Sequence, residues 1–366
     1  MSDTRTGKNE FKKDHILKNI RQYLPILFAT CLIIKVTGQI EDPSNRYGDA
    51  YKKYSGATCP LQPDSIRHFV YFARNRELIH NHPFLSIHRF TGAQIMYPWG
   101  LLEPQKGEYD FSIIREDYNY LLSYGKKLFI QLQDATFNPG FVGLPEYLLT
   151  AEFDGGTVPE FDDNGKIAGW VAKRWNPKVQ ERFALLLTRL GEEFDGKAEG
   201  INFQESAIGD KSKIDTSFTP VKYIESLKIN MLVLKKAFPE SIKMQYANFI
   251  PGEWLPGDDK GYLRSIYVYG QEIGVGLGSP DLMVRRKGQL NHALAMMHEG
   301  KFTVPIGIAV QDGNYIEQTG TDEIVTDRVN IVPLLHAFAK DFLKVDYMFW
   351  ACQEPYFSDD LIPCFN

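Results

Sequence analysis

The stretch Gly200-Ile-Asn-Phe-Gln-Glu-Ser-Ala-Ile-Gly209 decides how the rest of the chain is interpreted. It begins as an apolar run typical of a strand, and it delivers a carboxylate, Glu205, where the strand pattern gives way to a turn. Buried parallel strands usually exclude charge, so an acid at the carboxyl end of one is either paired structurally or placed there for chemistry. In a barrel of parallel strands, catalysis takes place at that end.

Strand-like and helix-like segments alternate from about Gly92 onward, which indicates a parallel sheet covered by helices. One helix is predicted to begin at Asn176 and Pro177. Four others are predicted at 113–124, 221–238, 288–299 and 330–342. Strands are predicted at 93–97, 128–133, 201–204, 243–249, 273–277, 304–311 and 347–352, whereas 266–271 is ambiguous. A run near 69–72, whose pattern fits a helix equally well, would make eight strands. We therefore predict the α/β class and a single-domain (β/α)8 barrel, a TIM barrel.

The composition is that of an ordinary globular protein, with 366 residues and a formal net charge of -5. This length suits one barrel of about 250 residues with insertions. Because there is no basic excess, we expect no nucleic-acid partner. A stretch rich in Gly, Pro and Asp over 135–175 follows the third predicted strand, and excursions of this length usually carry function or disorder rather than core.

The N-terminus has the layout of a signal peptide, with basic residues ahead of an apolar run from Tyr23 to Ile34. That run is shorter than the roughly 20 residues of a membrane span, and a cleavage point falls near Gly38-Gln39. We expect residues 1–38 to be a signal peptide or, if uncleaved, an N-terminal membrane anchor or a buried helix. The barrel would then occupy 39–366 of an exported protein, periplasmic or secreted, that meets a membrane only through its N-terminal segment.

Three cysteines remain after residue 38, and their spacing matches no zinc pattern. Cys59 and Cys364 lie near the two ends of the barrel domain, so an oxidising compartment would allow a disulfide between them. Cys352 falls in a strand-like run and is expected to be a small buried apolar group. His292 and His298 are six residues apart, which fits packed or solvated histidines better than metal ligands. We expect neither a metal nor a cofactor.

A second motif lies upstream, in Trp99-Gly-Leu-Leu-Glu103-Pro104 and the Gly107-Glu-Tyr109-Asp110-Phe111 that follows. It resembles the second-strand segment of the clan of retaining (β/α)8 glycoside hydrolases, and the resemblance extends over about 92–357. It implies the barrel fold and, at the end of the fourth strand, a glutamate that acts as general acid/base. The matching position is Glu205, preceded by Gln204 where the clan usually has Asn. Gln204 can still offer an amide to a sugar hydroxyl.

Glycosidic cleavage needs a second carboxyl group besides the proton donor. The resemblance places it at the end of the seventh strand as a glutamate, but here Gln311 and Asp312 occupy that position. Asp312 is the first candidate, and Glu354 at the end of the eighth strand is the second. A site without a conventional nucleophile is the third interpretation.

The resemblance also implies that Trp350, on the eighth strand, forms a sugar platform, although a tryptophan buried in the core would fit the sequence too. Further residues at predicted strand ends are expected to line the same cleft, with loop capping as the competing role for the glutamines. These residues are Tyr97, Trp99, Gln131, Gln133, Tyr246 and Gln311.

The leading functional hypothesis is a glycoside hydrolase that cleaves O-glycosidic bonds of a poly- or oligosaccharide. The alternative is a catalytically inactive barrel that binds carbohydrate or acts as a scaffold for a partner, which the missing seventh-strand glutamate favours. A metal-dependent hydrolase on the same fold would need histidine clusters that the sequence does not offer. Carbohydrate is therefore the expected binding partner.

Overall fold

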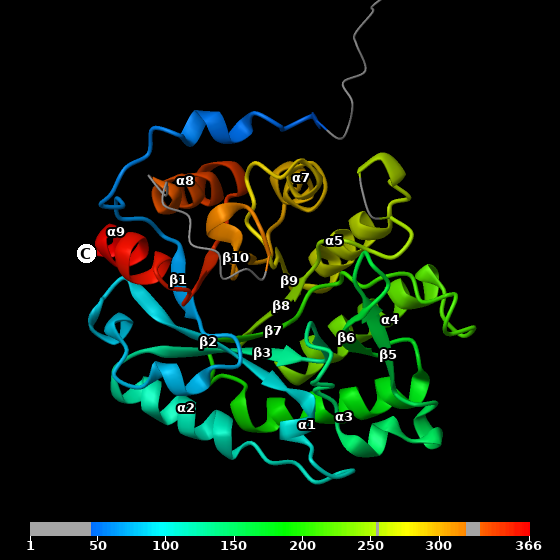
Figure 1. The fold of residues 1–366 in the computed structure, drawn as a ribbon. Coiled ribbons are helices and arrows are strands. Elements are labelled where there is room, and N and C mark those ends of the chain that lie inside the picture. Colours follow the sequence, from blue (N-terminus) through cyan, green and yellow to red (C-terminus); the bar gives the residue numbers. More distant parts are fainter. Residues whose placement is uncertain (1–44, 254–255, 320–329) are drawn as a thin grey trace, which may run out of the picture. The chain divides into compact units, whose positions relative to one another are not determined.

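The computed structural model describes residues 45–253, 256–319 and 330–366. Eight parallel strands close into a barrel in the order β1-β11-β10-β9-β8-β7-β3-β2. Figure 1 labels most of them. They are β1 (Arg67–Tyr71), β2 (Phe90–Pro98), β3 (Lys127–Gln133), β7 (Gly200–Phe203), β8 (Ile242–Tyr246), β9 (Gly276–Ser279), β10 (Ile306–Val310) and β11 (Tyr347–Ala351). The predicted TIM barrel is confirmed. The uncertain first segment is a strand, because β1 pairs with both β2 and β11 and closes the ring.

The predicted signal or anchor segment, 1–38, lies outside the described residues. Within them, no helix combines the length and apolar character needed to cross a membrane.

Helices surround the barrel (Figure 1). Helix α3 (Pro177–Phe194) begins as predicted, because the Asn176 side chain accepts from the backbone N–H of Lys178 and Val179 and proline occupies the first turn. The others are α1 (Trp99–Leu102), α2 (Ser112–Ser123), α4 (Pro220–Ala237), α5 (Tyr262–Ile273), α6 (Lys287–Leu290), α7 (Ala293–Glu299), α8 (Ile331–Ala337) and α9 (Ile362–Phe365). A π-helical turn, Phe338–Leu343, continues α8.

The barrel interior is aromatic toward the amino ends of the strands and polar toward their carboxyl ends. Phe129 lies 5.6 Å from Phe69 and 4.9 Å from Phe349 between ring centroids, and these rings fill the lower interior. Nearer the carboxyl ends of the strands, Gln94 donates to the Asn202 side chain at 2.9 Å. These packed layers of side chains support the loops at the carboxyl ends of the strands.

The sixth strand differs from its prediction. Residues 273–277 were expected to be the strand, but α5 extends to Ile273 and ends on Gly274, whose φ of 74° is a left-handed helix cap. The strand β9 therefore begins only at Gly276. The ambiguous segment 266–271 is helix, and the predicted helix 288–299 is interrupted at Asn291 and His292.

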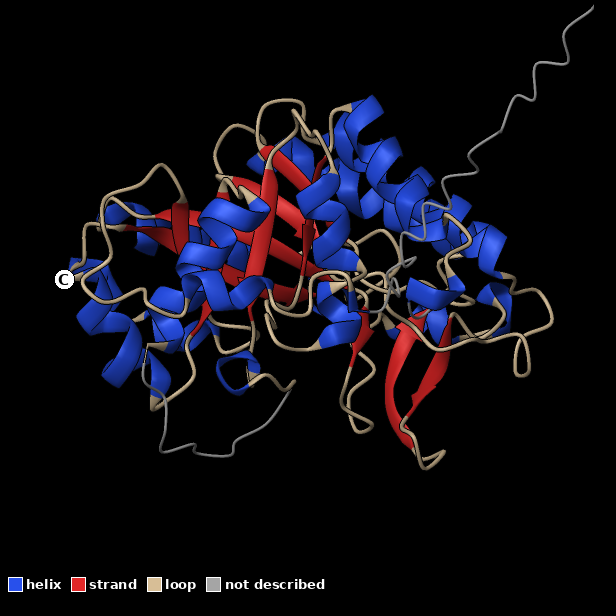
Figure 2. Cartoon of the chain, turned by 90° about the horizontal axis from the view of Figure 1, so that it is seen from above, coloured by secondary structure: helices blue, strands red, loops and turns tan. Residues whose placement is uncertain are grey.

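The stretch after β3 folds into a small antiparallel sheet of its own, in the order β4-β6-β5. Its strands are β4 (Ala135–Thr136), β5 (Thr157–Phe161) and β6 (Ile167–Ala172), with short 3-10 helices at Glu146–Leu149 and Ala151–Phe153. We call residues 135–172 the insertion. Its β5–β6 hairpin stands away from the barrel strands in Figure 2.

The two ends of the barrel domain are joined covalently. Cys59 and Cys364 form a disulfide, which confirms that prediction, and Leu61 N–H donates to the carbonyl of Cys364 at 2.9 Å. Cys352 follows β11, is half-buried, and places its sulfur 3.2 Å from Nε2 of His82. The C-terminal helix α9 thus lies beside β1 (Figure 1).

Candidate active site

Four consecutive strands each carry a polar side chain at the second residue beyond their carboxyl end. These residues are Glu205 after β7, Asn248 after β8, Asp281 after β9 and Asp312 after β10. All four line one cavity of about 1010 Å³. Because the carboxyl ends of parallel barrel strands meet at one rim, residues far apart in sequence are gathered in one place.

Glu205 faces this cavity from a tightly held turn. Its carboxylate accepts a hydrogen bond from Nδ2 of Asn248 at 2.6 Å. The amide of Asn248 is itself oriented, because its Oδ1 accepts from the backbone N–H of Ala207 at 3.1 Å. The carboxylate is therefore fixed in direction by a neighbour on the next strand.

The backbone of the same turn is clamped from behind. Arg174 donates to the Glu205 carbonyl at 3.2 Å and forms a two-pronged ion pair with Asp134 at 2.6 and 2.7 Å. Tyr223 donates its hydroxyl to the carbonyl of Ser206 at 2.9 Å. Such two-pronged pairs restrict geometry as well as adding energy.

The environment of Glu205 favours its protonated form. The pKa of Glu205 is raised to about 8, mainly by burial and then by the neighbouring charge of Asp281, and the hydrogen bond from Asn248 opposes both effects. Burial also raises the pKa of Asp281, opposed by the hydrogen bond that Asn314 donates to it at 2.9 Å. Two carboxyl groups therefore share this cavity, Asp281 buried and Glu205 half-buried, and Glu205 is largely protonated at neutral pH.

Tyr71, the last residue of β1, lies among these acids and lines the same cavity. Burial raises the pKa of its hydroxyl, and the charges of Asp312, Glu205 and Asp281 raise it further. The hydroxyl is therefore neutral and can donate a hydrogen bond to a carboxylate or to a ligand.

The structure separates the two candidates for the second carboxyl group. Asp312 is exposed and lines the cavity. Glu354 is not among the lining residues, and its two oxygens accept from the backbone N–H and hydroxyl of Ser358 at 3.1 and 2.6 Å. Glu354 is therefore engaged locally with Ser358 in this structure.

The predicted glutamines lie at the site. Gln131, Gln133, Gln204 and Gln311 line a smaller adjoining cavity of about 170 Å³, which shares Glu205 with the larger one. The side-chain oxygens of Gln131 and Gln133 are buried and have no hydrogen-bond partner among the described residues. Their capacity to accept hydrogen bonds is therefore unsatisfied within the described residues. Gln204, in contrast, uses its oxygen to cap the backbone N–H of Asp134 and Ala135.

The predicted aromatic residues lie elsewhere. Trp350 donates to Nδ1 of His68 at 3.2 Å, Trp99 to Glu103 at 2.9 Å and Tyr97 to Asp117 at 2.7 Å. Tyr246 points into the barrel, where Gln94 donates to its hydroxyl at 3.3 Å. None of these four buried side chains lines either cavity.

Strand geometry explains these positions. Successive side chains point to opposite faces, so Phe349 faces the interior while Trp350 faces the helices outside. Trp99 begins helix α1 rather than ending β2. Two site residues, Asp281 and Asn248, could have been found from the sequence once the ends of β9 and β8 were known, because both occupy the position that Glu205 occupies after β7.

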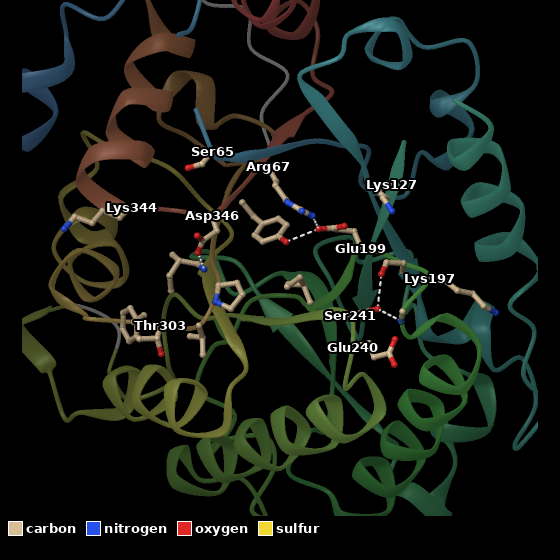
Figure 3. Close-up of a pocket in the computed structure, with 18 residues that line it drawn as sticks. Ser65, Arg67, Lys127, Lys197, Glu199, Glu240, Ser241, Thr303, Lys344 and Asp346 are labelled. Carbon is tan, nitrogen blue, oxygen red and sulfur yellow. Dashed lines mark hydrogen bonds and ion pairs between the residues drawn. The ribbon is translucent and has the colours of Figure 1, made fainter. Parts of the chain in front are cut away.

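A separate hollow, of about 680 Å³, opens at the amino ends of the strands and is drawn in Figure 3. Arg67 forms an ion pair there with Glu199, which also accepts from the Tyr347 hydroxyl at 3.0 Å. Asp346 accepts from the backbone N–H of Ile306 at 2.8 Å. These contacts tie neighbouring strands together, and that end of a barrel usually serves stability.

One cluster has the residue types of a metal site, namely Asp64, His68 and His336. Arg89 and His336 contact Asp64 at 2.8 and 3.0 Å. His68 accepts at Nδ1 from Trp350, so its Nε2 bears the proton and donates to Asp64 at 3.3 Å. Burial alone would raise the pKa of Asp64, but the hydrogen bonds from the two histidines hold it well below its usual range. Because the guanidinium of Arg89 also contacts the Asp64 carboxylate, these residues form a network of ion pairs and hydrogen bonds rather than a metal-binding site.

No family model matches the sequence, and neither does any curated protein. Solved structures do match. The catalytic domain of a β-amylase from Paenibacillus polymyxa has a TM-score of 0.50 and 9% identity, over 80% of this chain and 93% of that one. The fold is that of barrel glycoside hydrolases.

Two further solved structures also match this chain. A family 39 glycoside hydrolase from Bacteroides cellulosilyticus WH2 has a TM-score of 0.45 and 13% identity over 80% of this chain. This chain spans 58% of that protein. Endo-glycoceramidase II from Rhodococcus sp. has a TM-score of 0.47 and 11% identity, over 80% of this chain and 75% of that one. The likeness to these glycoside hydrolases concerns the fold alone.

Proposed function

We propose that the protein is a glycoside hydrolase that cleaves O-glycosidic bonds of an oligo- or polysaccharide, with Glu205 as general acid/base. The observation that carries this proposal is the pair of carboxyl groups, the half-buried Glu205 and the buried Asp281, that line one cavity at the carboxyl end of the barrel, where the charge of Asp281 helps to raise the pKa of Glu205. Glycosidases need one carboxyl group that is protonated at working pH and another that is ionised.

Glu205 would donate its proton to the oxygen of the leaving sugar as the glycosidic bond breaks. The resulting carboxylate would then take a proton from the attacking water. The N–H of Asn248, 2.6 Å away, stabilises the charge that Glu205 carries between these steps. Because the protonated form is the donor, the first step slows as pH rises through about 8.

Asp281 is our preferred second carboxyl group, and Asp312 is the alternative. Asp281 is buried, held by Asn314, and its charge acts on Glu205 more strongly than that of any other acid. Asp312 occupies the seventh-strand position that the sequence resemblance favours, but its side chain is exposed. An ionised carboxylate in either place would stabilise the positive charge that develops on the sugar ring.

Carbohydrate fits the polar lining. The unpartnered oxygens of Gln131 and Gln133 would accept hydrogen bonds from sugar hydroxyls in the smaller cavity. A second function, an inactive barrel that only binds carbohydrate, is favoured by one observation: Gln311 and an exposed Asp312 stand where the clan has its glutamate.

The test measures hydrolysis of aryl glycosides and oligosaccharides by the wild type and by Glu205→Gln, Asp281→Asn, Asp312→Asn and Glu354→Gln. We expect Glu205→Gln to lose about 10²- to 10⁴-fold in kcat on poorly activated leaving groups, a comparable loss in Asp281→Asn, and no loss in Glu354→Gln. A loss confined to Asp312→Asn would reassign the second carboxyl group. If the wild type binds sugars and cleaves none, the inactive barrel is the correct function.

A further inference from the structure

Two large apolar side chains of the insertion are open to water at the cavity. Phe137 is 65% exposed and Phe161 is 46% exposed, whereas the other phenylalanines of the described chain are buried or half-buried. Both rings line the larger cavity. Keeping such rings in water costs about 25 cal/mol per Å² of apolar surface, so a ligand that covers them gains that free energy.

We propose that Phe137 and Phe161 form a platform on which the apolar faces of pyranose rings stack, on the larger side of Glu205. This inference rests on the proposed function for the nature of the ligand. It assigns to the insertion the task that the sequence resemblance implied for Trp350, whose ring the structure buries against His68 and Phe365.

The positions of the two rings define a direction along the cavity. Phe137 lines both cavities, as do Glu205 and Tyr71, so it lies at their junction. Phe161 lines only the larger cavity. A sugar chain whose reacting bond lies at Glu205 would therefore meet Phe137 first and Phe161 farther out.

The backbone beneath the platform is fixed while the rings are open. Glu160, next to Phe161, is buried and accepts from Nζ of Lys211 at 2.9 Å and from the N–H of Gly209 at 3.1 Å. Thr136, next to Phe137, donates its hydroxyl to the carbonyl of Phe141 at 2.7 Å. A ring on a fixed backbone loses little entropy when a ligand covers it.

The chemistry of both sides matches a sugar ring. A pyranose has an apolar C–H face and a rim of hydroxyl groups, so it needs a flat apolar surface and hydrogen-bond acceptors together. The insertion supplies the first, and the buried oxygens of Gln131 and Gln133 supply the second next to Phe137. At about 1010 Å³ the larger cavity lies at the upper end of the 300–1,000 Å³ typical of ligand sites, which leaves room for several rings.

The experiment measures Kd for cellohexaose, laminarihexaose, xylohexaose and mannohexaose by calorimetry, in a Glu205→Gln background that prevents turnover. We expect Phe137→Ala and Phe161→Ala each to weaken binding of the preferred hexasaccharide about tenfold. Phe161→Tyr should retain affinity, and Phe161→Leu should lose it, because leucine is apolar but not flat. The matched control is Leu122→Ala, a residue 50% exposed on α2 outside both cavities, which should leave Kd unchanged.

Melting temperature separates a platform from a structural role. Truncation of an exposed ring should leave it unchanged. Unchanged Kd in both alanine variants, or a fall in melting temperature that accounts for the lost binding, overturns the platform. If wild-type protein hydrolyses a hexasaccharide and the phenylalanine variants behave like it, the platform fails and the proposed function stands. If no hexasaccharide is cleaved but both variants bind more weakly, the platform stands and the proposed function fails. If no hexasaccharide binds, both fail.

Discussion

Burial is the main cause of the raised pKa of Glu205, and two neighbours change that pKa in opposite directions. Each neighbour can be removed separately. Asp281→Asn removes a negative charge and should lower the pKa of Glu205 from about 8, whereas Asn248→Ala removes a donor to the ionised form and should raise it. The measurement is a titration of the Glu205 carboxyl group by isotope-edited infrared or carbon NMR spectroscopy. Shifts of the same sign in the two variants would contradict this account, and Glu354→Gln, whose carboxylate caps Ser358, is the control.

The structure places Glu205 at the cavity and Trp350 away from it, and the sequence could indicate only the first of these positions, for one physical reason. The position of a residue after a strand end depends on the backbone, which the apolar pattern reveals. The direction of a side chain depends on the alternation of faces, and a shift of one residue reverses it. Tyr97 also lies away from the cavities, because it donates to Asp117 on α2, whereas Trp99 belongs to helix α1 rather than to the end of β2.

Among the elements, the boundary of β9 had the largest effect on the site. Small and apolar residues continue from α5 into β9, so the sequence could not show that Gly274 ends a helix. With that boundary misplaced, Asp281 did not stand out as a strand-end acid. The long excursion after β3 was expected to carry function or disorder rather than core, but it folds into an antiparallel sheet and contributes Leu148, Phe153 and Val158 to the hydrophobic core. The sequence could not show this sheet, because it depends on contacts with distant loops, such as that of Lys211 with Glu160.

The ion pair between Lys211 and Glu160 leads to a prediction for the stability of the insertion. Lys211→Met leaves the buried carboxylate of Glu160 unpaired, and breaking a buried pair typically costs about 3–5 kcal/mol. Backbone amides of 157–172 should therefore exchange with deuterium at least about a hundredfold faster, while the barrel strands keep their protection. Lys106→Met, which breaks an exposed pair with Glu152, should cost less than about 1 kcal/mol. Equal exchange in the two variants would show that the ion pair does not hold the insertion.

For the whole molecule, the alternation of strands and helices was enough to predict the barrel, because helices that alternate with strands pack against the outside of a parallel sheet. The uncertain point was closure: the apolar run at β1 has no local feature that distinguishes strand from helix, and only its pairing with β11 decides. The disulfide between Cys59 and Cys364 depends on the same closure.

We propose that the chain is exported, since disulfides persist mainly in oxidising compartments. The mature protein recovered from the periplasm or medium should then begin near Gln39 by N-terminal sequencing. Cys364→Ser should lower the free energy of unfolding by about 2–5 kcal/mol, and a reductant should lower it in the wild type but not in the variant. Recovery of the intact N-terminus in a cytoplasmic fraction with reduced cysteines would contradict export.

The pairing of β1 with β11 also determines when during protein synthesis the barrel can close. Arg67 pairs with Tyr347, and at about 5–20 residues per second the ribosome needs between roughly 15 seconds and a minute to make the roughly 280 residues between them. During that interval β1 presents an unsatisfied edge to every other nascent strand nearby. The barrel cannot close before almost the entire polypeptide has been made, so a chaperone that shields β1 has a longer task than one that serves any later strand.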